Sequence, residues 1–399
     1  MKDYMKSRNI LVRSKTLPPI AVGITIFIGS SFGVDTIRIV AKPQGPAQSL
    51  WITDFLPAYN YLAGSKAFNP QIVGGLLNYD TNGNFIQYGT SPEAGPPLFG
   101  PPSLRVPPTD RIPPAYWGLM GVNADAQNNL YLTSYSSVYK ATPTGQIQSE
   151  YLNTFLNYGL QKIAVSSTNI YFIKDNTFFA LCPLSQIAGS SVTFYQENLD
   201  GATKVTSLDY YQGVLYVSWL FSTYTKVAIH NANTGAFKSW LWSSTSVGSL
   251  QDIFVWQNPL TKTLYLYGTD VTNAQIVVFN FATGKIKNYP IGIPVLKIGQ
   301  TYQGITAYIG DTTPYVPCGI VVDSVGNIYF TAVPYASIGV TYIYGPAKLI
   351  KWKPNFEVVA VWGNQIPLIN YATYQYVDST QYAPFIFINP LYMCIQGRT

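Results

Sequence analysis

Ile328-Tyr329-Phe330 is one of five copies of a triplet in which a tyrosine stands between two apolar residues. The other four copies are Leu130-Tyr131-Leu132, Ile170-Tyr171-Phe172, Leu215-Tyr216-Val217 and Leu264-Tyr265-Leu266. The tyrosines are 40, 45, 49 and 64 residues apart along the chain. Internal similarity with a period in the forties is typical of the blades of a β-propeller.

Each triplet lies between two kinds of turn. A polar turn precedes it, as in Asp125–Asn129 and Asp323–Asn327, and a hairpin with glycine or asparagine at its tip follows, as in Asn231–Gly235. Asp, Asn and Gly tolerate the backbone angles that tight reversals need. The pattern predicts four-stranded units, which bury their faces by stacking around an axis. The expected fold class is therefore all-β, a β-propeller with four-stranded antiparallel blades.

The number of blades depends on how the two ends of the chain are used. Six repeats are centred on Trp51, Tyr131, Tyr171, Tyr216, Tyr265 and Tyr329. Residues 370–396 hold three more strand-like runs, one fewer than a blade needs. Residues 20–28 alternate with the period of two that is typical of a strand, and this N-terminal strand would close the last blade and remove its exposed edge. We therefore expect seven blades, with six blades and an accessory tail as the alternative.

No linker divides the chain, so we expect a basic tail, residues 1–16, followed by one propeller domain, residues 17–399. The tail carries five Lys and Arg residues against one Asp. The apolar stretch 17–34 also fits a secretory signal or a membrane anchor, so membrane contact through it stays open beside the strand interpretation. Basic residues interleaved with aromatic ones do not recur elsewhere, so binding of nucleic acid is expected only through the tail.

The composition favours an exterior location. Charged residues are 11% of the 399 residues, whereas a typical soluble domain has about 25%. Tyrosine alone numbers 32, and Asp and Glu together number 18. Because few carboxylates are available to pair in the native state, little stability should be lost in acid. The composition is similar to that of virion and envelope proteins of hyperthermoacidophilic archaea and their viruses.

Residues that could perform chemistry are sparse. His230 is the only histidine, and no histidine-based or serine-based catalytic motif accompanies it, so we expect no catalytic residue. Asp125 and Asp323 stand at turn positions, where a carboxylate accepts backbone hydrogen bonds more often than it binds a metal. We therefore expect no metal and no cofactor.

The three cysteines, Cys182, Cys318 and Cys394, are scattered and lack a Cys-x-x-Cys spacing. They are best interpreted as small buried apolar residues. One disulfide with one thiol left over stays possible outside the cell, and the sequence does not choose the pair.

Two stretches resemble a known group of propellers. Gly319–Val333, GIVVDSVGNIYFTAV, and Gly121–Tyr135, GVNADAQNNLYLTSY, resemble the inner strands of NHL-type and streptogramin-lyase-like propellers. The lyase and the related lactonases have their activity at one end of the ring, on a histidine-centred site or an acidic metal-binding set. The resemblance therefore implies that an enzyme of this kind would have such a site. One histidine and no matching acidic set are present here, so activity is not carried over. Other members bind proteins, sugars or RNA, which makes binding the expected function.

Two insertions are candidates for an interaction surface. Ser91–Trp117 holds nine prolines, which favour an extended and semi-rigid chain. Val333–Gly345 is rich in tyrosine. Tyr, Trp and Arg are frequent at binding hot spots, and a packing brace over the ring is an equally good interpretation. The candidate residues are Arg105, Asp110, Arg111, Tyr116, Trp117, Tyr335, Tyr342 and Tyr344.

The sequence thus predicts a non-enzymatic structural or attachment protein on an exterior surface, most directly a virion protein that mediates protein–protein assembly or host-surface binding. Expected partners are other structural or surface proteins, further copies of the chain, and a glycan or protein of the host surface. The alternatives are a secreted propeller enzyme of the lyase or lactonase kind and a carbohydrate-binding propeller.

Overall fold

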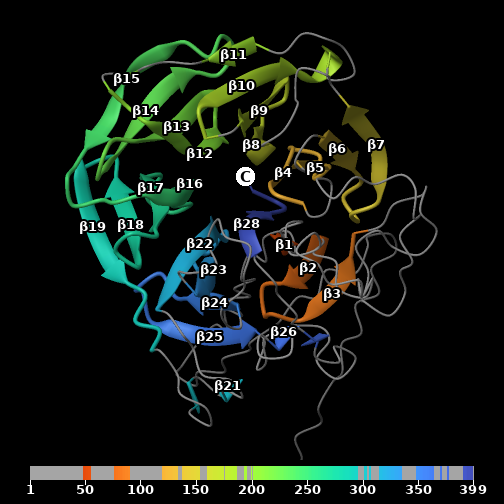
Figure 1. Ribbon diagram of the computed structural model, residues 1–399, viewed down its shortest axis with the longest axis vertical. Coiled ribbons are helices and arrows are strands. Elements are labelled where there is room, and N and C mark those ends of the chain that lie inside the picture. The colour runs from red at the N-terminus through yellow and green to blue at the C-terminus, as the bar shows by residue number, and fades with distance from the viewer. Residues whose placement is uncertain are drawn as a thin grey trace, which may run out of the picture. The chain divides into compact units, whose positions relative to one another are not determined.

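Six four-stranded antiparallel sheets make up most of the part of the chain that the structure describes, in a computed structural model. The sheets stand around a common centre as the blades of a propeller (Figure 1). The described residues are 48–54, 76–89, 119–133, 137–152, 160–174, 176–186, 193–195, 199, 201–294, 301–302, 305–306, 314–334, 347–363, 369–370, 375–376 and 390–398.

Each blade has one strand at the axis of the ring and three more that follow it outward. From the axis outward, blade 1 contains β28 (Pro390–Ile395), β1 (Ser49–Asp54), β2 (Leu76–Asp80) and β3 (Phe85–Tyr88). Blade 2 contains β4 (Val122–Ala124), β5 (Leu130–Thr133), β6 (Ser137–Ala141) and β7 (Ile147–Leu152). Blade 3 contains β8 (Leu160–Val165), β9 (Asn169–Lys174), β10 (Phe178–Pro183) and β11 (Thr193–Tyr195), with the 3-10 helix η5 (Leu184–Gln186) after β10.

The other three blades have the same order of strands. Blade 4 contains β12 (Lys204–Tyr211), β13 (Val214–Leu220), β14 (Thr225–Asn231) and β15 (Phe237–Ser243). Blade 5 contains β16 (Leu250–Gln257), β17 (Leu264–Asp270), β18 (Gln275–Asn280) and β19 (Lys285–Pro290). Blade 6 contains β22 (Tyr315–Val322), β23 (Ile328–Pro334), β24 (Lys348–Trp352) and β25 (Val358–Gly363). Two short hairpins are separate, β20 (Thr301–Tyr302) with β21 (Ile305–Thr306) and β26 (Ile369–Asn370) with β27 (Gln375–Tyr376).

The ring closes through the C-terminal strand β28, which pairs with β1 in blade 1. The innermost strands contact one another in the order β28, β4, β8, β12, β16, β22 and back to β28. The expectation of seven blades is therefore wrong, and the alternative number, six, is correct. Neither described strand after residue 370 adds a blade, because β28 completes the first one and, among the described residues, β27 pairs with β26 alone. Residues 20–28, expected to close the ring, lie outside the described residues, and β28 occupies that closing position.

The recurring triplet joins neighbouring blades. The Tyr329 hydroxyl in blade 6 donates to the Thr81 carbonyl, 3.0 Å away in the β2–β3 turn of blade 1. The Tyr171 hydroxyl in blade 3 donates to the Ala232 carbonyl, 2.6 Å away in the β14–β15 turn of blade 4. Trp51, at the same position in blade 1, lies against Gly145 in the β6–β7 turn of blade 2. The large residue at the centre of the triplet therefore reaches the outer turn of the next blade.

Buried threonines on the second strands make a further connection between blades. The Thr53 hydroxyl donates to the Met120 carbonyl just before β4, at 2.6 Å, and the Thr269 hydroxyl donates to the Cys318 carbonyl in β22, also at 2.6 Å. Thr133 makes the equivalent bond to Gln161 in β8. An unpaired buried carbonyl costs about 1–3 kcal/mol, so each bond removes such a penalty at the blade interface.

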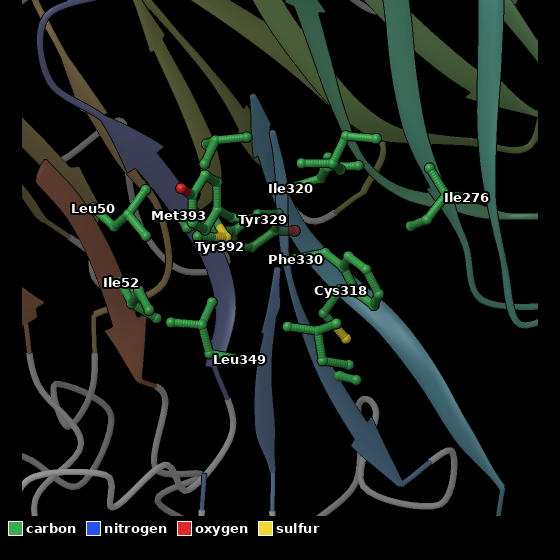
Figure 2. Packing of buried hydrophobic residues seen from close by; sticks show 14 of the residues in the cluster. Leu50, Ile52, Ile276, Cys318, Ile320, Tyr329, Phe330, Leu349, Tyr392 and Met393 are labelled. Carbon is green, nitrogen blue, oxygen red and sulfur yellow. The ribbon is translucent and has the colours of Figure 1, made fainter. Parts of the chain in front are cut away.

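Buried apolar side chains fill the spaces between blades in clusters that each span neighbouring sheets. Figure 2 shows side chains of one such cluster, among them Leu50 and Ile52 of β1, Tyr392 of β28, and Tyr329 and Phe330 of β23. Complete burial of such a side chain contributes about 1.5–3 kcal/mol. The core therefore lies between the faces of the sheets, and it connects the strand that closes the ring to blade 6.

Candidate functional site

The interaction surface predicted from the sequence lies outside the described residues. This holds for all eight candidates, namely Arg105, Asp110, Arg111, Tyr116, Trp117, Tyr335, Tyr342 and Tyr344. The strands that lead to the two insertions are described. β3 precedes the proline-rich insertion and β23 precedes the tyrosine-rich one.

β3 and β23 end at the same end of two neighbouring blades. Tyr329, near the start of β23, bonds the carbonyl of Thr81, which directly follows β2. β3 is antiparallel to β2 and therefore runs away from this contact, as β23 does. Blades 6 and 1 are neighbours, since β22 contacts β28. The chain thus leaves both blades at the end of the ring opposite to the Tyr329–Thr81 contact.

A buried ion pair crosses the axis of the ring. Lys162 on β8 of blade 3 places its Nζ 2.7 Å from Oδ1 of Asp252 on β16 of blade 5, with 2% and 0% of the two side chains exposed. The same Nζ lies 5.5 Å from the ring centroid of Tyr392 on β28. Buried charges of this kind are tolerated when they are paired and fully hydrogen-bonded. The three residues connect blades 1, 3 and 5 at the axis.

The remaining bonds to Asp252 add blades 4 and 6 to this connection. Its Oδ1 also accepts a hydrogen bond from the Ser207 hydroxyl on β12, at 3.1 Å, and one from the Ile253 amide, at 2.9 Å. Its Oδ2 accepts a bond from the Ile320 amide on β22, at 3.1 Å. Burial raises the pKa of Asp252 to about 6, and the nearby Lys162 charge opposes that rise. Both carboxylate oxygens are thus engaged by the protein itself.

Tyr392 extends the axial network on the other side of Lys162. Its hydroxyl accepts a hydrogen bond of 3.0 Å from the side-chain Nε2 of Gln251 on β16. Burial raises the pKa of this tyrosine, and the neighbouring Asp252 charge adds to the rise. The hydroxyl therefore stays neutral and acts as a hydrogen-bonding group.

A second ion pair joins blades 1 and 4, and its Asp209 lies two residues beyond Ser207 on β12. Nη1 and Nη2 of Arg398, which follows β28, donate to Oδ1 and Oδ2 of Asp209 on β12 at 2.8 and 2.7 Å. Nη2 also donates to the Val255 carbonyl on β16 at 2.5 Å. The guanidinium carbon lies 4.1 Å from the Phe254 ring centroid and 5.2 Å from that of Tyr211.

These charged residues were not singled out by sequence reasoning. The sequence did contain a signal for them. Asp252 interrupts the apolar run of β16, and Lys162 interrupts the apolar run of β8, in a chain with few charged residues. The arrangement can hold blades from opposite sides of the ring together. Among the described residues, no group of three or more His, Cys, Asp and Glu side chains is placed to hold a metal ion.

His230 is buried in an aromatic environment on β14. Its Nδ1 lies 2.9 Å from the Gly235 carbonyl in the following turn, which assigns the proton to that nitrogen. The ring centroid of Phe179 in blade 3 lies 4.9 Å away. Burial lowers the pKa of His230 to about 4, and the bond to Gly235 opposes this. Nε2 of His230 and the indole nitrogen of Trp219 are both buried without a hydrogen-bond partner.

Asp125 and Asp323 cap turns, as the sequence predicts. Oδ1 of Asp125 accepts the amides of Gln127 and Asn129 at 2.9 and 2.8 Å. Asp323 repeats these bonds to Val325 and Asn327 at 3.0 and 2.8 Å. The interpretation of these carboxylates as turn caps is confirmed.

All three cysteines are buried and free, which confirms their interpretation as interior apolar residues. Burial raises the pKa of Cys182 to about 11 and that of Cys394 to about 12, and it raises the pKa of Cys318 as well. Their thiols stay protonated near neutral pH, and a protonated thiol is a poor nucleophile and metal ligand.

The seven tryptophans within the described ranges are all buried or half-buried. Trp117, the eighth, belongs to the proline-rich insertion. The described part of the chain also contains no helix that is long and apolar enough to cross a membrane.

Comparison with known proteins assigns the chain to no family. No protein-family profile and no curated protein matches the chain. A crystal structure of a protein of unknown function from Bacteroides caccae is similar over 88% of this chain and 99% of its own, with 10% identity and a TM-score of 0.47. The computationally designed Ika8 protein is similar over 75% of this chain and 74% of its own, with 9% identity and a TM-score of 0.36.

Proposed function

We propose that this protein is a non-enzymatic structural or attachment module on an exterior surface, and most directly a virion protein that assembles with other proteins or binds a host surface. The observation that carries the proposal is the common exit of the two predicted interaction segments. β3 and β23 end at the same end of the neighbouring blades 1 and 6. Segments that leave a rigid ring together can contribute to one surface.

The axial ion pairs support a structural use of the ring. Lys162, Asp252 and Arg398 are the kinds of residue that a propeller enzyme could use at its axis, and here their contacts join five blades. Each carboxylate oxygen of Asp252 already has a donor from the protein. A rigid ring of this kind suits a particle component that has to keep its shape.

The low charge content supports an exterior and acidic setting. Only 18 carboxylates are present in 399 residues. This feature fits a surface protein of a hot, acidic habitat.

The first experiment is fractionation of the native source, followed by an intact mass of the protein from each fraction. We expect the protein in particles or large assemblies, with an uncleaved chain. Recovery as a soluble protein that begins after about Val34 contradicts the proposal and favours a processed, secreted enzyme or sugar-binding propeller.

A second experiment separates an interaction surface from a packing brace. Deletion of residues 96–108 should abolish assembly or attachment and leave the melting temperature almost unchanged. Deletion of the turn residues 259–261 serves as the control. Leu260 in this β16–β17 turn is 90% exposed, and the turn lies at the end of the ring opposite to the one where β3 and β23 end. A large fall in melting temperature with assembly retained would make the insertion a brace.

A further inference from the structure

The pocket around Arg398 has the composition of a guanidinium receptor. Asp209 faces the two terminal nitrogens with both oxygens, in the paired geometry that distinguishes arginine from lysine. The Val255 carbonyl accepts a third bond, and the rings of Phe254 and Tyr211 lie within cation–π range. Planar shape, charge and aromatic contact are thus all matched to one chemical group.

The receptor is held in place without help from Arg398. Oδ2 of Asp209 also accepts the backbone amide of Val255 at 2.7 Å, which fixes the carboxylate between β12 and β16. The Asp209 side chain is 1% exposed, whereas Arg398 is 20% exposed. The carboxylate is therefore buried, whereas part of the Arg398 side chain remains in contact with solvent.

The residues directly before Arg398 are held by bonds that do not involve the arginine. Nε2 of Gln396 donates to the Asn128 and Pro143 carbonyls at 2.9 and 2.8 Å, and the Gly397 amide donates to Oδ1 of Asn128 at 2.8 Å. These bonds tie the segment to blade 2 independently of the arginine. The fit of Arg398 is also incomplete, because its buried Nε has no acceptor among the residues that the structure describes.

We propose that Asp209, Tyr211, Phe254 and the Val255 carbonyl form a guanidinium-binding site, which Arg398 fills within the chain and which an arginine side chain of a partner protein fills by displacing it. The partner half of this proposal rests on the proposed assembly function, and the site itself does not. The site is specific for arginine over lysine, because one ammonium cannot engage both Asp209 oxygens in the same plane.

Chemical rescue of Arg398→Ala tests the site. The substitution leaves the Asp209 charge buried and unpaired, which should raise the equilibrium constant for unfolding roughly a hundredfold or more. Methylguanidinium at ten times its dissociation constant should lower that constant again by roughly tenfold, since it binds only the folded state. Methylammonium at the same concentration should not, and methylguanidinium should stabilise wild type less than the variant, because there it has to displace Arg398.

The matched control is Asp209→Asn combined with Arg398→Ala, in which the pocket keeps its shape and loses its charge. Rescue of the single variant and not of the double variant supports the site. Absence of rescue in the folded single variant overturns it, as does equal rescue by methylammonium. If Arg398→Ala does not fold, Arg398→Met keeps an apolar stem against Phe254 and is tested in the same way.

The partner half is tested by calorimetric titration of Arg398→Ala with acetyl-Gly-Arg-amide and with acetyl-Gly-Lys-amide. Binding of the arginine peptide alone, with weaker binding to wild type, supports displacement. Equal binding of the two peptides overturns it. Both experiments use the isolated protein. A negative result therefore contradicts the guanidinium site and does not bear on the assembly proposal, which the fractionation experiment tests separately.

Discussion

Replacement of His230 by asparagine should change how the stability of the protein depends on pH. In the folded state burial lowers the pKa of His230 from 6.5 to about 4. Between these two values the unfolded chain binds a proton on this residue that the folded chain does not bind. Protonation of His230 therefore favours the unfolded state. The stability that the neutral imidazole contributes at higher pH is lost as the pH falls through that window.

The size of the effect follows from the two pKa values. At about 1.4 kcal/mol per pKa unit, His230 removes about 3 kcal/mol of stability between pH 6.5 and 4. Asp252 acts in the opposite direction, because its pKa rises from 3.8 to about 6 and the folded state binds the extra proton. Its contribution is therefore a gain of stability as the pH falls. In wild type the two contributions oppose each other.

Asparagine can keep the donor to the Gly235 carbonyl while removing the titrating ring. Urea denaturation at pH 7, 6, 5 and 4, followed by tryptophan fluorescence, gives the free energy of unfolding of each protein. Relative to wild type, His230→Asn should gain about 3 kcal/mol between pH 6.5 and 4. Trp219→Phe is the control, because it alters the same aromatic cluster and no titrating group. A pH dependence of His230→Asn identical to that of wild type would refute the reasoning.

The remaining predictions concern packing and the axis. Lys162→Met should cost about 3–5 kcal/mol at pH 7, because it leaves the Asp252 charge buried and unpaired; the loss should shrink at pH 4–5, and unfolding curves at both pH values measure it. Thr269→Val should cost about 1–3 kcal/mol by urea titration, while Thr269→Ser keeps the hydroxyl and should cost less. Gly145→Ala should lower the melting temperature far more than Gly284→Ala: both positions have positive φ, but an added Cβ meets the ring of a buried tryptophan 2.4 Å away only at Gly145. Equal effects of the two glycine variants would contradict the packing described for that turn.

Local features of the fold could be predicted from the sequence. The triplets around Tyr171 and Tyr329 and the turns at Asp125 and Asp323 are all found where the pattern places them. A turn or a short strand is specified by neighbouring residues, through backbone angles and side-chain alternation. Such information is present in any short stretch of the chain.

Closure of the ring could not be predicted in the same way. One of the three strand-like runs in residues 370–396, Leu391–Ile395, lies in the strand β28. Its pairing with β1, more than 330 residues earlier, depends on contacts that alternation does not encode. The same limitation applies to Lys162 and Asp252, which meet only because the innermost strands of the non-adjacent blades 3 and 5 both line the axis.

The candidate surface on the two insertions is a different case. Its composition suggested a surface, and the described strands establish where the chain leaves blades 1 and 6. Proline fixes its own backbone torsion, but the sequence of a long insertion does not specify which neighbour it packs on. The deletion of residues 96–108 is therefore decisive for this part.

The most direct test is complementation of a chain that ends at Asn389 with a peptide of residues 390–399. Both the rigid ring and the guanidinium site depend on closure by β28. We expect the shortened chain to lose cooperative unfolding and to regain it with the peptide, and a peptide carrying Arg398→Ala should restore less stability. A shortened chain that unfolds cooperatively at the wild-type temperature, without the peptide, would show that another strand closes the ring.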